Sequence, residues 1–106
     1  MSLDNETDTY EFHEIVDRGR SLFNALLAQY SKAIHREVLE ENANELLIKD
    51  YRKYKKNFKE ISCSLVNLGS IAEVEKILNK HSVIYKSNLE KVKNKETLAI
   101  LDKEIT

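Results

Sequence analysis

The sequence contains no proline and no tryptophan, and only two glycines and one cysteine among its 106 residues. β-Rich folds need many tight turns, and tight turns draw heavily on glycine and proline. Long helices need neither residue, so the composition favours an all-α protein. The chain has the length of one domain, and its 42% of apolar residues is enough for a packed core.

The single cysteine, Cys63, excludes an internal disulfide and a metal site built on several thiolates. One thiol fits a reducing compartment, and the acidic first residues lack the apolar segment of a secretory signal. The longest uncharged stretches, residues 21–31 and 61–72, are far shorter than the roughly 20 apolar residues that span a bilayer. We therefore expect an intracellular protein, cytoplasmic or nuclear, without membrane insertion.

Two apolar seams with alternating steps of four and three residues predict two long helices of the coiled-coil type. The first seam consists of Phe12, Val16, Gly19, Phe23, Leu26, Tyr30 and Ala33. The second consists of Leu47, Tyr51, Tyr54, Phe58, Ile61, Leu65 and Leu68. We expect helices over about residues 9–41 and 43–68, separated by the capping signal Asn42-Ala43-Asn44-Glu45. Gly19 lies in the seam, which predicts a close approach of a neighbouring helix.

A third helix is predicted over about residues 71–93. Gly69 suits the left-handed residue that ends many helices, and Ser70-Ile71-Ala72-Glu73 has the pattern of a capping box. So short a connection makes the second and third helices antiparallel neighbours. His81 and Asn88 occupy seam positions in the third helix. Each is expected to have a polar partner that sets helix register, or else to mark a wetter surface where another chain docks.

The two ends of the chain complete the predicted organisation. Residues 1–17 carry six acids and no Lys or Arg, and residues 1–8 are expected to form a disordered acidic leader. After Asn94 a new apolar phase begins at Leu98, which fits either a short fourth helix over 95–105 or continuation of the third helix. We predict an elongated antiparallel three-helix bundle as a single domain over residues 9–106.

The stretch from residue 49 to 60 interleaves three aromatic residues with six basic ones, a pattern common on nucleic-acid-binding surfaces. At 100° per residue, Tyr51, Tyr54 and Phe58 fall on the apolar seam, so we expect them to fill the core and not to stack on bases. Five cations form what we call the basic stripe on the opposite face: Lys49, Arg52, Lys53, Lys56 and Lys59. The stripe is either a solvated helix face or a candidate site for phosphates or an acidic partner.

Patterns typical of catalysis and cofactor binding are missing. The three histidines are scattered, and there is no Gly-x-Ser-x-Gly elbow and no phosphate-binding glycine loop. We therefore expect a protein that is not an enzyme, with no catalytic residues, no cofactor and no metal ligands.

The long first seam and the fading third seam suggest a role in binding other chains. The third helix loses its apolar face near residue 92, so part of the first seam is expected to remain for a second copy or a different protein. We expect a non-enzymatic protein–protein interaction module, such as a small adaptor, regulator or subunit of a larger helical oligomer. The alternative is a nucleic-acid-associated protein that uses the basic stripe.

Overall fold

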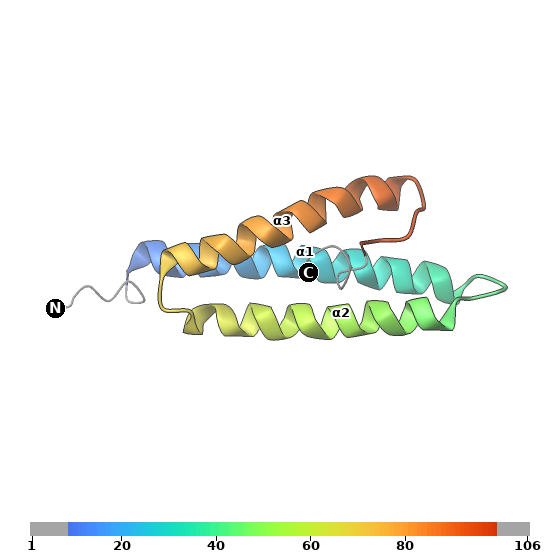
Figure 1. Ribbon diagram of the computed structural model, residues 1–106, viewed down its shortest axis with the longest axis horizontal. Helices are drawn as coiled ribbons and strands as arrows, with labels where there is room; N and C mark the ends of the chain where they lie inside the picture. The colour runs from blue at the N-terminus through green and yellow to red at the C-terminus, as the bar shows by residue number, and fades with distance from the viewer. Residues whose placement is uncertain (1–8, 100–106) are drawn as a thin grey trace.

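The computed structural model describes residues 9–99, which form an elongated bundle of three α-helices (Figure 1). The bundle measures 61 × 23 × 21 Å. The helices run up, down and up along one long axis, which confirms the predicted fold class. They are α1 (Tyr10–Val38), α2 (Glu45–Ser64), which continues as a short 3-10 turn η2 (Leu65–Asn67), and α3 (Ile71–Lys93). The predicted acidic leader, residues 1–8, lies outside the described residues.

Each helix begins at a side-chain cap. The Thr9 hydroxyl accepts a hydrogen bond from the Phe12 amide at 3.0 Å and starts α1. The Ser70 hydroxyl accepts from the Glu73 amide at 3.2 Å and starts α3, as the capping-box pattern predicted. A cap of this kind satisfies one of the amides that the first turn of a helix leaves without a partner.

The boundary between α1 and α2 differs from the prediction by a few residues. Asn44, and not Asn42, is the cap of α2, and its side chain accepts from the Leu47 amide at 3.0 Å. The Glu37 carboxylate accepts from the Asn44 amide at 2.8 Å, which ties the end of α1 to the start of α2. α1 therefore ends at Val38, earlier than the predicted residue 41.

The predicted seams form the core. All seven residues of the first seam are buried, and so are Tyr51, Tyr54, Phe58 and Leu65 of the second. The Tyr30 ring lies 5.4 Å from the Tyr51 ring and 5.4 Å from the Phe58 ring, measured between centroids. The three aromatic residues of the 49–60 stretch are therefore core residues, as predicted.

At Gly19, side chains of the two neighbouring segments lie very close to the backbone of α1. A Cβ atom at this position would lie 2.6 Å from Leu65 Cδ1 and 2.9 Å from Leu78 Cδ1. Both distances are shorter than real Cβ contacts, so only glycine fits without displacing a leucine. The nearby Gly69, with φ of +74°, ends the α2 segment in the left-handed conformation that its sequence position predicted.

α1 packs along both α2 and α3, whereas α2 and α3 contact each other little. Figure 1 shows α3 tilting away from α2 towards its C-terminal end, with the chain returning between them. We call residues 96–99 of this returning segment the strap. Leu98 and Ala99 are buried in the bundle.

The strap lies where either a short fourth helix or a continuation of the third helix was expected. α3 ends where the Lys95 amide donates to the Val92 carbonyl and the Glu96 amide donates to the Lys91 carbonyl. Lys95 has φ of +58°, and this left-handed residue reverses the chain direction. The prediction of helix from residue 95 is thus wrong over residues 95–99, and residues 100–105 lie outside the described part.

Candidate functional site

The basic stripe lies on the face of α2 that points away from the bundle. All five of its side chains, Lys49, Arg52, Lys53, Lys56 and Lys59, are exposed. Their positions centre about 180° around the helix from the buried seam, as 100° per residue requires. Packing in the core therefore does not explain why these five positions carry basic residues.

The stripe has a defined length and a slight hollow. Arg52, Lys56 and Lys59 line a depression of about 360 Å³ together with the half-buried Lys55. Glu45 and Glu60 are exposed and fall on the same helix face, one at each end of the stripe. The cationic track is consequently about 15 Å long, from residue 49 to residue 59.

A second candidate site is the strap cleft, which we define as the space between α2 and α3 lined by Tyr30, Tyr51 and Asn88. The Leu98 amide donates to the Tyr51 hydroxyl at 3.0 Å. The Ala99 amide donates to Asn88 Oδ1 at 2.9 Å, and the Tyr30 hydroxyl donates to the Ala99 carbonyl at 3.0 Å. Side chains from all three helices therefore hold the backbone of two consecutive strap residues.

Asn88 connects the strap cleft to α1. Its Nδ2 donates to Gln29 Oε1 and to the Tyr30 hydroxyl, both at 3.3 Å, and Gln29 Nε2 donates to the Tyr85 carbonyl at 3.1 Å. The polar partner that the sequence predicted for Asn88 is thus found within the chain. The prediction that part of the α1 seam remains for another chain is wrong, because all seven seam residues are buried within the bundle. At Tyr30 the strap contributes to this burial through Ala99.

Burial keeps the polar groups of the core uncharged. Burial raises the pKa of the Tyr51 phenol above its usual value of 10.0, so the hydroxyl that accepts from Leu98 stays neutral at physiological pH. Burial also lowers the pKa of His81 below 6.5. The His81 Nδ1–H donates to the Ile77 carbonyl at 2.8 Å, and its ring packs 4.9 Å from the Phe23 ring between centroids. His81 is therefore a neutral core residue.

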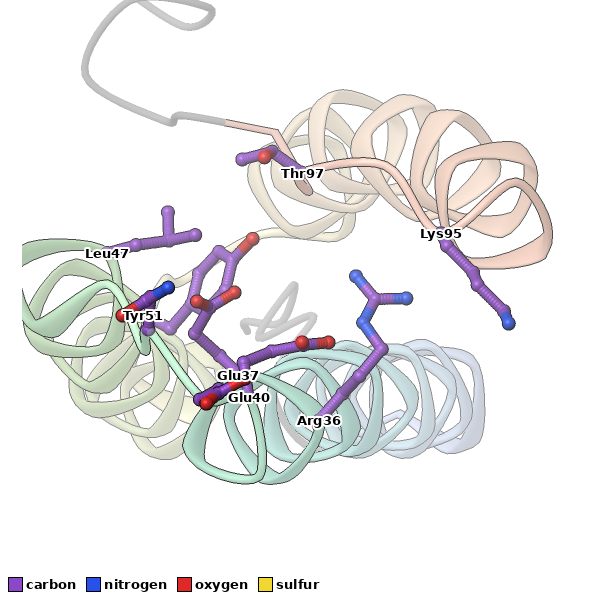
Figure 2. A pocket seen from close by; sticks show the side chains of 9 residues that line it. Arg36, Glu37, Glu40, Leu47, Tyr51, Lys95 and Thr97 are labelled. Atoms are coloured by element: carbon purple, nitrogen blue, oxygen red, sulfur yellow. The ribbon is translucent and has the colours of Figure 1, made fainter.

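A solvent-open cavity of about 510 Å³ lies beside the strap, between the end of α1, the start of α2 and the turn after α3 (Figure 2). Figure 2 shows the Tyr51 ring pointing towards the segment that carries Thr97. The lining of the cavity combines three carboxylates with two cations: Glu37, Glu40, Glu41, Arg36 and Lys95. Arg36 also donates to the Glu96 carbonyl at 3.4 Å, so the cavity wall includes a contact to the strap.

Within residues 9–99, no group of three or more His, Cys, Asp or Glu side chains is arranged to hold a metal ion. In that part of the chain, every helix is too short or too polar to cross a membrane.

No protein-family model matches the chain, and no similar protein was found among curated sequences or solved structures.

The sequence predicted the stripe but not the strap cleft. Asn88 indicated part of the strap cleft, because an amide side chain in an apolar seam usually has a polar partner. Gln29, which adjoins the seam residue Tyr30, was the matching signal on α1. Nothing in the spacing of Leu98 showed that its backbone would meet Tyr51.

Proposed function

We propose that the protein is a non-enzymatic protein–protein interaction module that uses the basic stripe of α2 to bind an acidic segment of a partner protein. The observation that carries the proposal is the exposure of all five cations on the α2 face opposite to the core. Exposed surface charges contribute little to folding stability, so the stability of the bundle does not explain the stripe. An acidic partner that pairs with several of these cations at once gains more binding energy than a single surface ion pair provides.

The length of the stripe favours a protein partner over a nucleic acid. Glu45 and Glu60 close both ends of the track, and their carboxylates would repel a polyanion that continued past it. The formal net charge of −1 gives the molecule little long-range attraction for DNA or RNA. An acidic helix or loop about 15 Å long matches the track without meeting either carboxylate.

The role we propose is that of a small adaptor, regulator or subunit within a larger assembly in the cytoplasm or nucleus. The lone exposed thiol of Cys63 fits a reducing compartment.

The test is a charge reversal on the stripe with a matched reversal on another helix. The stripe variant is Arg52→Glu/Lys56→Glu, and the control is Lys76→Glu/Lys80→Glu, which reverses two exposed lysines on α3. Quantitative affinity purification should identify proteins that the wild type and the control capture and the stripe variant loses. The purified partner should bind the stripe variant at least tenfold more weakly, with a salt dependence that the control retains.

Equal capture by both variants would contradict the proposal. Duplex DNA and single-stranded RNA are tested beside the partner at low salt. Binding of either nucleic acid that disappears in the stripe variant alone would instead support the nucleic-acid alternative.

A further inference from the structure

We propose that the strap cleft is a receptor for an extended peptide segment of another protein, and that the chain's own strap occupies it as a competitor in cis. The cleft is a different surface from the basic stripe. The inference therefore stands whether or not the stripe binds an acidic partner.

The strap is recognised mainly through its backbone. The groups that are bound are the amides of Leu98 and Ala99 and the carbonyl of Ala99. Every peptide carries these groups, with the exception of the amide at proline, so a segment from another chain can present them in the same way. Recognition of an extended segment by main-chain hydrogen bonds is a common mode of peptide binding.

The cleft itself is built for such an occupant. Direct packing of α2 on α3 would need apolar side chains, yet Tyr51 of α2 and Asn88 of α3 bring a hydroxyl and an amide to this place, and Tyr30 of α1 adds a second hydroxyl. Buried polar groups are costly when they lack partners. The folded helices therefore favour a state in which some backbone segment fills the cleft.

The strap also defines which side chains the cleft accepts. Leu98 is 1% exposed and Ala99 is 0% exposed. The first position takes a large apolar side chain, and the second takes a small one. The partner segment is accordingly an extended strand with an apolar residue followed by a small residue, and without proline at either position.

The strap can leave without dismantling the end of α3. The last hydrogen bond of that helix end is made by the Glu96 amide, before the first buried residue of the strap. Lys95, with φ of +58°, lies within that hydrogen-bonded helix end and before the buried residues of the strap. The neighbouring cavity of about 510 Å³ leaves room for the flanking residues of a longer segment.

Competition in cis sets the expected affinities. A tethered strap has an effective concentration in the millimolar range, so a free peptide binds the wild-type chain only weakly. Weakening the strap without altering the cleft should expose the true affinity of the cleft.

The experiment uses the full chain with Ala99→Asp, because a carboxylate at this fully buried position expels the strap. The probe is a fluorescent peptide with the sequence of residues 95–106, measured by anisotropy. We expect the Ala99→Asp chain to bind the probe at least tenfold more tightly than the wild type. Adding Asn88→Leu to that chain should reverse the gain, and a probe that carries Ala99→Asp itself should not bind.

A second variant, Leu98→Ala, weakens the docking of the strap without introducing a buried charge. It replaces Ala99→Asp in the anisotropy measurement if Ala99→Asp does not fold. Folded variants that fail to bind the probe at about 1 mM would overturn the proposal. Loss of the helical circular dichroism signal in both variants would overturn it as well, because the strap would then be a required part of the fold.

Discussion

The two ends of the bundle are closed in different ways. At the end where Gly69 and Ser70 connect α2 to α3, Leu65 and Leu78 both lie against Gly19 of α1. At the other end α3 leaves α2, and the strap fills the space between them through hydrogen bonds to Tyr30, Tyr51 and Asn88. We call these the turn end and the strap end.

This difference distinguishes the contacts that the whole bundle needs from the contacts that hold only the strap. The turn end is stabilised by apolar contact, which is lost only when the helices separate. The strap end depends on three hydrogen bonds, each with a modest net contribution, and on the burial of the Leu98 and Ala99 side chains. Disruption at the turn end should therefore lower the stability of the whole bundle, whereas disruption at the strap end should release mainly the strap.

The largest effect is expected at the turn end from Gly19→Val. The new side chain overlaps Leu65 and Leu78, and Leu65 is fully buried and has little room to move. We expect the free energy of unfolding to fall by about 3 kcal/mol, measured by urea denaturation.

The matched control for Gly19→Val is Arg20→Val, an exposed neighbour on the same helix. The free energy of unfolding of this variant should stay within about 0.5 kcal/mol of the wild-type value. Equal losses in the two variants would show that valine destabilises this part of α1 irrespective of position, and that the close approach at Gly19 is not the cause.

A smaller effect is expected at the strap end from Asn88→Leu. The change leaves the Ala99 amide without its acceptor and removes the link to Gln29. We expect the free energy of unfolding to fall by about 2 kcal/mol. The fall cannot exceed the free energy with which the strap docks, because the strap can open and return the Ala99 amide to water. The helical signal should remain that of the wild type.

Asn79→Leu is the control for Asn88→Leu, since Asn79 is exposed on the same helix. It should have little effect on stability. If Asn88→Leu cost more than Gly19→Val, the strap end would be the better stabilised of the two, contrary to the comparison.

The smallest effect is expected at the hinge of the strap. Lys95 adopts φ of +58°, where glycine is favoured. Lys95→Gly should therefore raise the free energy of unfolding by about 0.5 kcal/mol, after the larger chain entropy of glycine in the unfolded state is counted. Asn94→Gly, at a position with φ of −93°, should not stabilise the protein, and a gain there would contradict the explanation.

The sequence predicted the turn end well because its information is local. Steps of four and three residues place Phe12 to Ala33 on one face of α1, and Ser70 with Glu73 marks the start of α3 within four residues. The same geometry placed the basic stripe on the outer face of α2, where it is found. Whether the stripe binds a partner is a property that spacing alone does not contain.

The strap end was missed because its contacts join distant parts of the chain. The Tyr30 hydroxyl meets a carbonyl 69 residues away, and the Tyr51 hydroxyl meets an amide 47 residues away. A seam position predicts that a tyrosine ring is buried, but it does not predict where the hydroxyl points. Leu98 also follows a helix-like spacing with Leu101, so its pattern suggested a fourth helix.

Native-state amide hydrogen exchange of the wild type tests the central claim, that the strap is an occupant of an independently folded bundle. The amides of Leu98 and Ala99 are hydrogen-bonded and can be compared with that of Phe58 in the middle of α2. We predict that the two strap amides exchange through a local opening that costs at least about 2 kcal/mol less than the opening that exposes Phe58. Equal opening free energies for all three amides would show that the strap and the bundle unfold together, and would contradict the account.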